Sequence, residues 1–306
     1  MDLYSYGRNF YTDYKIPMKL IKNDNFHSTL SCCQCFIIII IQEGSCLLKL
    51  NDKQYPIIAP AVLCVNEKEN FIFEKSNQLK TYSIYFHPNV INNSFNYDNI
   101  RGNVWDTFST TVCQDIYTLE IFLNRNVYSG YCAIGPNTLR RLNYLYDKIQ
   151  SEIEEQRDMG WPCRHRSYFI EICYMLRRIY DLNPVDETLS LDYVQNSESI
   201  INDVIYYLYS NYSRKITITE LINTFHINKT SLMEKFSNST GFTIMNYLTR
   251  IRVNVAAMIL RDTTMSVSEI MERVGFVDMS HFGRMFKKYM GYSPSEYRQK
   301  YCWMIS

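Results

Sequence analysis

The chain has 306 residues, which suits two domains better than one. Its formal net charge of +1 is divided unevenly, with 13 Lys and Arg against 9 Asp and Glu from Ser197 onward and 19 against 22 before it. This modest excess of positive charge excludes tight binding of nucleic acid by charge alone, and it places any nucleic-acid contact near the carboxyl end.

The sequence carries no recognisable targeting or membrane-spanning segment. Met1 to Leu3 is not a basic region followed by an apolar run, and the longest apolar stretch, Cys35 to Ile41, is too short to cross a bilayer. We therefore expect a cytoplasmic protein that makes no membrane contact. Ten cysteines in that compartment should be reduced thiols.

The cysteine cluster Cys32, Cys33 and Cys35 is the first candidate for special chemistry. It lacks a second Cys/His pair at the spacing of a zinc site, and free cysteine usually behaves as a small buried hydrophobe. Packing within strands is therefore expected, and a redox or metal sensor is the alternative. We expect no metal and no cofactor.

The amino-terminal residues 1–135 are predicted to form a domain rich in strands. Between Phe26 and Phe86, short β-branched and apolar runs alternate with turn signals such as Asn51-Asp52. The predicted strands are Cys35–Gln42, Cys46–Leu50, Val62–Val65 and Thr81–Phe86. Several short strands of this kind predict a small antiparallel barrel or jelly roll.

Two helices are predicted over residues 136–184. Pro136 stands at the first turn of one, and a second begins near Arg166 and ends before Asn183-Pro184. The first helix carries an apolar seam with heptad spacing, which favours a dimer contact; covering its own barrel is the alternative. The seam residues are Leu139, Leu142, Tyr146, Ile149 and Ile153. Residues 185–198, polar and acidic, are expected to be a linker.

The carboxyl-terminal residues 199–306 are predicted to be helical throughout and to contain two helix-turn-helix motifs. A first helix covers Ser199 to Asn211. In the first motif, over 218–241, Thr219 and Asn228 are the expected caps of two helices. An apolar stripe that includes Met245, Leu248 and either Ile251 or Arg252 predicts a linking helix over 243–261.

The second motif, over 274–298, carries the strongest pattern. Gly275 suits a left-handed turn, and Asp278 is expected to cap the next helix. Phe282, either Met285 or Phe286, and Tyr289 recur at helical spacing and should face the core. The outward side chains of the two motifs are the candidate DNA contacts: Lys229, Thr230, Ser231 and Glu234 in the first, and Met279, Ser280, His281, Arg284, Lys287 and Lys288 in the second.

Glu234 and Arg284 differ most among these candidates. A carboxylate near phosphates is repelled, although it can accept a hydrogen bond from cytosine N4. Arg284 has the fork geometry that matches guanine O6 and N7. We expect the first motif to carry the smaller share of specificity.

The second motif resembles the signature of the AraC family of transcriptional regulators. The matching residues are Ile270, Gly275, Phe276, Asp278, Ser280, Phe282, Arg284, Phe286, Lys287, Lys288, Gly291, Ser293, Pro294, Tyr297 and Arg298. Arg252 and Ala256 match the family's linking helix, whereas Ile222 and Met271 stand where the family usually has Ala. The first motif matches more loosely.

The resemblance implies an α+β chain, with an amino-terminal cupin-like antiparallel β-barrel and helices followed by an all-α DNA-binding domain. It also implies recognition helices about 34 Å apart on double-stranded promoter DNA. Further implied partners are a small-molecule effector, a second copy of the chain, and RNA polymerase if the protein is an activator.

A cupin-type metal-dependent enzyme with an appended DNA-binding domain is the alternative function. Such enzymes bind a metal through a His-x-His pair, a carboxylate and a further His, but the amino-terminal half offers only His27 and His87. We therefore expect a regulator rather than an enzyme.

Overall fold

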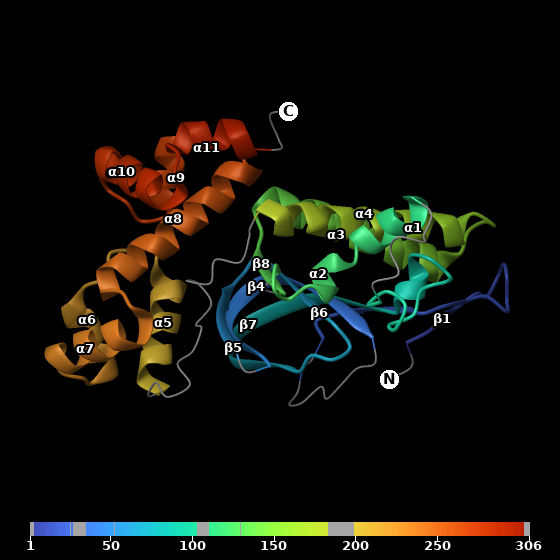
Figure 1. The fold of residues 1–306 in the computed structure, drawn as a ribbon, viewed down its shortest axis with the longest axis horizontal. Helices are drawn as coiled ribbons and strands as arrows, with labels where there is room; N and C mark the ends of the chain where they lie inside the picture. The colour runs from blue at the N-terminus through green and yellow to red at the C-terminus, as the bar shows by residue number, and fades with distance from the viewer. Residues whose placement is uncertain are drawn as a thin grey trace.

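The computed structural model describes residues 3–24, 26, 35–51, 53–102, 110–128, 130–182 and 199–302. The expected linker over 185–198, and His27, Cys32 and Cys33, lie outside the described residues. A curved sheet with two long helices forms the amino-terminal part of the molecule, and a group of shorter helices around one long helix forms the carboxyl-terminal part (Figure 1).

The amino-terminal part is built on an antiparallel sheet. A small two-stranded sheet pairs β1 (Ser5–Tyr6) with β2 (Lys15–Ile16). The main sheet contains β3 (Met18–Lys22), β4 (Phe36–Leu50), β5 (Lys53–Ile58), β6 (Ala61–Val65), β7 (Phe71–Phe86) and β8 (Tyr131–Ala133). Its order is β3-β7-β4-β6-β8, and β5 also pairs with β4. The antiparallel sheet and the α+β class are confirmed, but the described strands do not close, so the cupin-like barrel is not confirmed.

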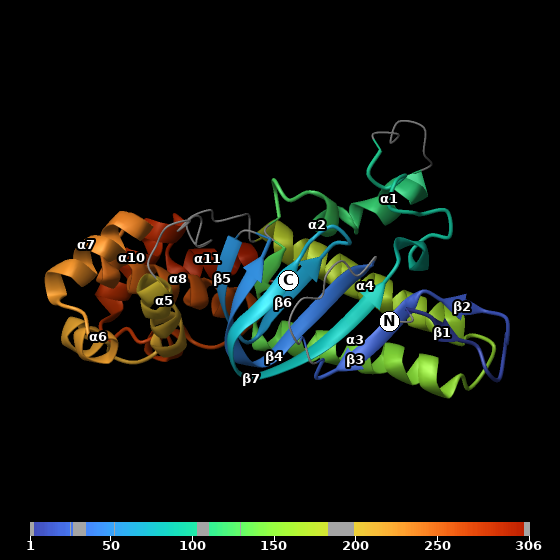
Figure 2. The same ribbon diagram turned by 90° about the horizontal axis from the view of Figure 1, so that it is seen from below.

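Strand β4 is one bent strand where the sequence predicts two. Its pairing with β7 shifts register between Ile41 and Leu47. Gly44 lies in this bend with φ +90°, and a Cβ there would stand 2.4 Å from the carbonyl oxygen of Asn77. The bend lets the first half of β4 pair with β6 and the second half with β5, as Figure 2 shows from below.

Helices cover one face of the sheet. Two long helices, α3 (Pro136–Glu155) and α4 (Trp161–Leu182), lie side by side along it (Figures 1 and 2). The short 3₁₀ helix η1 (Pro88–Val90), α1 (Thr110–Tyr117) and α2 (Glu120–Leu123) precede them in the chain. Pro136 begins α3 as predicted, whereas α4 starts at Trp161, earlier than the expected Arg166.

The apolar seam of α3 faces the protein's own core. Leu142, Tyr146 and Ile149 are 0% exposed, and the Tyr146 ring lies 4.7 Å from that of Tyr82 on β7. Leu139 and Ile153 are partly buried against the same cluster of sheet and α4 side chains. The seam is therefore not the expected dimer contact. It packs against the sheet of its own chain, because burying apolar side chains on that apolar surface is favourable.

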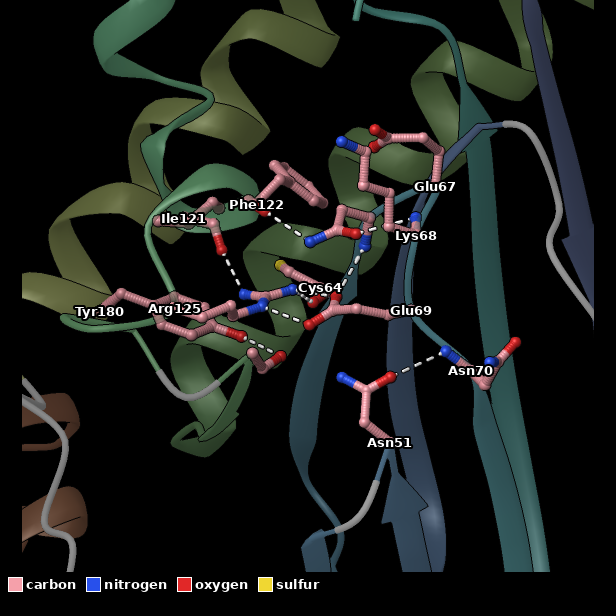
Figure 3. A network of polar contacts seen from close by, with 12 residues as sticks. Asn51, Cys64, Glu67, Lys68, Glu69, Asn70, Ile121, Phe122, Arg125 and Tyr180 are labelled. Atoms are coloured by element: carbon pink, nitrogen blue, oxygen red, sulfur yellow. Dashed lines mark hydrogen bonds and ion pairs between the residues drawn. The ribbon is translucent and has the colours of Figure 1, made fainter. Parts of the chain in front are cut away.

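A buried polar network ties the loop after α2 to the sheet (Figure 3). Arg125 donates from Nε to Glu69 at 2.6 Å, from Nη1 to the Ile121 carbonyl at 2.6 Å and from Nη2 to the Cys64 carbonyl at 2.7 Å. Tyr180 of α4 donates to the Gly130 carbonyl at 2.7 Å. Because each donor has an acceptor, the free-energy cost of burying these polar groups is offset, and the hydrogen bonds stabilise the packing of α2 and α4.

The described cysteines of the sheet are packed in its interior. Cys35, Cys46 and Cys64 are buried. Burial raises the pKa of the Cys46 thiol and of the Cys64 thiol to about 12, so both thiols stay protonated at neutral pH. This agrees with the expected role of these residues as small hydrophobes.

The carboxyl-terminal part is helical. Its elements are α5 (Ser199–Asn211), α6 (Ile218–Phe225), α7 (Lys229–Thr240), α8 (Ile244–Asp262), α9 (Val267–Arg273), α10 (Met279–Met290) and α11 (Pro294–Tyr301). The core of the first half contains Ile201, Leu232 and Phe236, and that of the second contains Leu260, Phe282 and Phe286. Across the residues that the structure describes, no helix is long and apolar enough to span a bilayer.

Candidate nucleic-acid interface

The first helix-turn-helix motif consists of α6 and α7. Thr217 caps α6, because its hydroxyl accepts from the Glu220 N–H at 3.1 Å while the Glu220 carboxylate accepts from the Thr217 N–H at 3.4 Å. The expected cap, Thr219, is therefore wrong; it is the second residue of α6, and the N-cap position is occupied by Thr217. Asn228 caps α7 as predicted, accepting from the Ser231 N–H at 2.8 Å.

The second motif consists of α9 and α10. Ser266 and Glu269 form a capping box at the start of α9. Gly275 has φ +83°, and a Cβ there would stand 2.8 Å from the carbonyl oxygens of Tyr212 and Ser213, so the turn needs glycine for both conformation and space. Asp278 accepts from the His281 N–H at 2.6 Å and so begins α10, as predicted.

Aromatic packing fixes the orientation of α10. Phe282 and Phe286 are 0% exposed, which settles the choice between Phe286 and the half-buried Met285. The Phe286 ring lies 5.7 Å from that of Phe282 and 5.4 Å from that of Tyr297 on α11. With one face of α10 held in this way, the opposite face is presented in a fixed direction.

The candidate contacts of both motifs lie on these opposite faces. Ser231 is half-buried, and the other nine predicted contact residues are exposed: Lys229, Thr230, Glu234, Met279, Ser280, His281, Arg284, Lys287 and Lys288. The His281 ring packs edge-on against Phe276 at 5.6 Å, which limits its freedom. Within the described part of the chain, no hydrogen bond or ion pair occupies the Arg284 guanidinium. That group is available for a base edge or a phosphate.

The linking helix α8 joins the motifs. Leu248 and Ile251 are buried at 1% exposed each, whereas Met245 is 43% exposed, so its place in the apolar stripe is wrong. It lies in the first turn of α8, where Ile244 and Tyr247 instead pack into the core of the first motif. Arg252 faces the other way and donates to the carbonyls of Tyr212 and Arg214, both at 2.8 Å. It thereby ties α8 to the segment that follows α5.

The two bulky departures from the AraC pattern are accommodated by packing. Ile222 is half-buried against the core of the first motif, and Met271 is 7% exposed in the core of the second. Neither residue disturbs the packing of its motif.

One exposed candidate contact was not predicted from the sequence. Val277 is 96% exposed in the turn directly before the cap Asp278. Its position in the turn of the motif, directly before the predicted cap, could have identified it.

The two motifs share one side of the molecule. In both views α7 and α10 lie at the end of the molecule away from the sheet, and α8 runs between the two motifs (Figures 1 and 2). Two capped recognition helices with exposed polar faces, joined by one continuous helix, define a DNA-binding domain with a double helix-turn-helix.

Comparisons with known proteins found one matching family model and several similar chains. A family model described as a helix-turn-helix domain matches residues 221–300. The transcriptional activator RhaS of Escherichia coli is 23% identical over 266 residues, covering 86% of this chain and 84% of RhaS. A probable AraC family regulator from Rhodopseudomonas palustris is 28% identical, with 34% of this chain and 99% of that chain covered and a TM-score of 0.33. Apo ToxT from Vibrio cholerae is 13% identical, with 93% and 97% covered and a TM-score of 0.31.

The carboxyl-terminal domain is an AraC-type helix-turn-helix domain, and the chain is a DNA-binding transcriptional regulator of the AraC type.

Proposed function

We propose that the chain activates transcription by placing α7 and α10 in successive major grooves of promoter DNA, under the control of its amino-terminal part. The main support is the pair of capped recognition helices, which lie at the same end of the molecule (Figure 1) and carry exposed candidate contact residues. The similarity to RhaS, a transcriptional activator, supports activation. An activator of this kind would have RNA polymerase as a partner. A cytoplasmic location follows from the same role, since bacterial promoter DNA lies there.

The predicted side chains would divide the work of DNA binding. Arg284, with Ser280 and His281 beside it, would read base edges, whereas Lys287 and Lys288 at the last turn of α10 would contact phosphates. On α7, Lys229 and Thr230 lie at the amino-terminal end with Ser231 and Glu234 following. Met279 offers an apolar contact for a thymine methyl group.

A small-molecule effector in the amino-terminal part has support from buried polar groups. The hydroxyls of Thr81 and Ser83 on β7 have no hydrogen-bond partner within the described residues, although the side chains are only 2% and 0% exposed. They alternate along β7 with residues that face α3, so they belong to the other face of the sheet. Because a buried hydroxyl without a partner costs free energy, a polar group of a ligand on that face would be stabilised there.

A homodimer remains part of the proposal, on a different surface from the buried seam. Tyr144 of α3 and Tyr174 of α4 are 47% and 44% exposed, so both side chains reach solvent. Replacing Tyr144 with Glu should weaken self-association in sedimentation experiments. Replacing Leu142 with Glu should instead unfold the amino-terminal part, because that side chain has no exposed surface.

A genome-wide binding map followed by transcription with purified RNA polymerase tests the proposed function. The expected result is a consensus with two half-sites and increased transcript from templates that carry it. Arg284→Ala should relax the consensus at one base pair and reduce the increase in transcript. A map without a consensus would contradict sequence-specific binding. Reduced transcript from templates that carry the consensus would contradict activation.

The enzymatic alternative is tested by elemental analysis of the purified protein. His87 accepts from the Asn89 N–H through Nδ1 at 3.2 Å and caps η1, which is a structural role. Among the described residues, no three His, Cys, Asp or Glu side chains are grouped so as to hold a metal ion. A stoichiometric transition metal in the protein would favour the enzyme.

A further inference from the structure

The amino-terminal end of α3 is capped by a residue from the DNA-binding domain. Its own N-cap residue is Gly135, which has no side chain to accept a hydrogen bond. The carboxylate of Asp262 takes that place, accepting from the Asn137 N–H at 2.7 Å and from the Thr138 N–H at 3.1 Å. The Thr138 hydroxyl also donates to it, and the Asn137 side-chain amide donates to the Asp262 carbonyl at 2.7 Å.

The shape of Gly135 matches this contact. Its backbone, at φ −87° and ψ 171°, is one that any residue adopts, so glycine is not needed there for conformation. It is needed for space, because a Cβ at Gly135 would stand 2.1 Å from Oδ2 and 2.3 Å from Cβ of Asp262. The missing cap and the missing Cβ are thus explained by the same partner.

The carboxylate of Asp262 is buried in this contact. The residue is 2% exposed, and Thr138 is 3% exposed. Burial raises the pKa of Asp262 above its ordinary value, and the hydrogen bonds from Thr138 and Asn137 act against that rise. The free N–H groups and the positive end of the α3 dipole are suitable surroundings for the ionised form.

Asp262 is well placed to hold the second motif. It is the last residue of α8, and Ser266 caps α9 a few residues later. Leu260 lies less than one helical turn before Asp262 and belongs to the core that contains Phe282 and Phe286 of α10. A shift of the Asp262 backbone therefore moves the second motif with it.

A separate contact holds the other end of the DNA-binding domain. Tyr206 of α5 shares a hydrogen bond of 2.7 Å with Ser45, and Asn202 donates to Gln54 at 3.0 Å. Leu47 of β4 is 2% exposed and belongs to the same apolar cluster as Ile201. The domain is thus attached to the sheet at α5 and to α3 at Asp262, while the outer faces of α7 and α10 stay exposed.

We propose that Asp262 is a positioning residue, which caps α3 across the domain boundary and so fixes the orientation of the second helix-turn-helix motif on the amino-terminal part. The contact does not cover the recognition faces, so it sets where they point and leaves their access to DNA unchanged. It gives α3, which packs directly on the sheet, a direct connection to the DNA-binding domain.

Small-angle scattering and hydrogen exchange of the full-length protein test this role. In Asp262→Ala, we expect a larger radius of gyration and exchange at the Asn137 and Thr138 amides that is roughly fivefold faster or more, since an N-cap is lost. Asp262→Asn keeps an accepting oxygen and should restore both values towards those of the unmodified protein. Unchanged scattering in Asp262→Ala would overturn the proposal.

Gly135→Ser separates positioning from stabilisation of α3. The new hydroxyl would cap α3 locally, while the new Cβ would displace Asp262. The amides should then stay protected although the radius of gyration increases; scattering equal to that of the unmodified protein would contradict the close approach. This variant also covers the case in which Asp262→Ala fails to fold.

Two controls locate the effect. Asp203→Ala removes the exposed ion pair between Asp203 of α5 and Lys75 and should leave scattering unchanged, because such pairs contribute little. For Asp262→Ala, affinity for a duplex with a single half-site should stay within about twofold, as expected for a change outside the recognition faces. A large loss of that affinity with unchanged scattering would place the action of Asp262 inside the DNA-binding domain. Scattering and exchange require no DNA, so they decide the proposal even if the proposed function fails.

Discussion

The recognition helices α7 and α10 share a scaffold but differ in the chemistry of their outer faces. Asn228 and Asp278 cap them in the same way, each accepting from the third residue of its helix, and Gly241 and Gly291 end them with φ +72° and +78°. On the outer faces, Glu234 of α7 occupies the position that corresponds to Arg284 of α10.

This difference teaches that fold and DNA affinity are set by separate residues. Leu232 and Phe236 pack in the first core as Phe282 and Phe286 pack in the second, so both helices are held through the same two positions. Basic residues stand in the last turn of α10 and none stand in the last turn of α7. The second motif should therefore supply most of the affinity, and the first mainly the register.

Arg284→Ala should have the largest effect on DNA binding. If the guanidinium reads a guanine, its loss costs roughly 1–3 kcal/mol on the operator and relaxes preference at one base pair. The measurement is a titration of operator and scrambled duplexes at several salt concentrations. Equal losses on the two duplexes would show that Arg284 contacts a phosphate, and would remove the difference in base reading between the helices.

Lys287→Ala should weaken binding to the operator and to the scrambled duplex alike. A phosphate contact releases counterions, so its removal should reduce the slope of log K against log salt by about one unit. Ser237 is the corresponding residue of α7, and Ser237→Ala is the matched control with no expected change of slope. A slope change confined to the operator would contradict a phosphate role for Lys287.

Glu234→Ala should have a smaller effect, in the opposite direction. Removing an exposed carboxylate near phosphates should raise affinity for both duplexes by about 1 kcal/mol or less. The same titrations measure it. A loss confined to the operator would instead show that Glu234 reads a cytosine, and the first motif would then carry more specificity than we expect.

The sequence was sufficient to predict the second motif, because local signals agree there. Gly275 and Asp278 each have a local physical cause, and the structure confirms both. The helical spacing from Phe282 left Met285 and Phe286 open, and the structure selects Phe286. The role of the α3 seam was not predictable in this way, because an apolar stripe does not specify its partner. The capping of α3 by Asp262 joins residues 124 or more apart in sequence, and no local pattern reports it.

The smallest expected effect is on the pH dependence of stability, which should differ between α6 and α9, the first helices of the two motifs. Glu220 of α6 accepts from Arg214 and Tyr207 besides its capping role, and these hydrogen bonds, Arg214 first, lower its pKa to about 2. The pKa of Glu269 in α9 is lowered by the hydrogen bonds from Ser266. Because the folded state favours the ionised carboxylate, the stabilisation is present above the ordinary pKa of about 4.5 and is lost as the pH falls towards about 2.

Thermal unfolding of the full-length protein between pH 7 and pH 3 tests this difference. Glu220→Gln should lower the unfolding temperature at pH 7 by on the order of 2 °C or less, since solvent screens an exposed group, and the difference should shrink as the pH falls. Glu269→Gln is the matched variant and should show a smaller shift, because Glu269 lacks partners equivalent to Arg214 and Tyr207 among the described residues. If both variants lower the unfolding temperature by the same amount over the same pH range, the hydrogen bonds from Arg214 and Tyr207 to Glu220 do not add stability to the first motif. The two motifs would then differ only at their DNA-facing side chains.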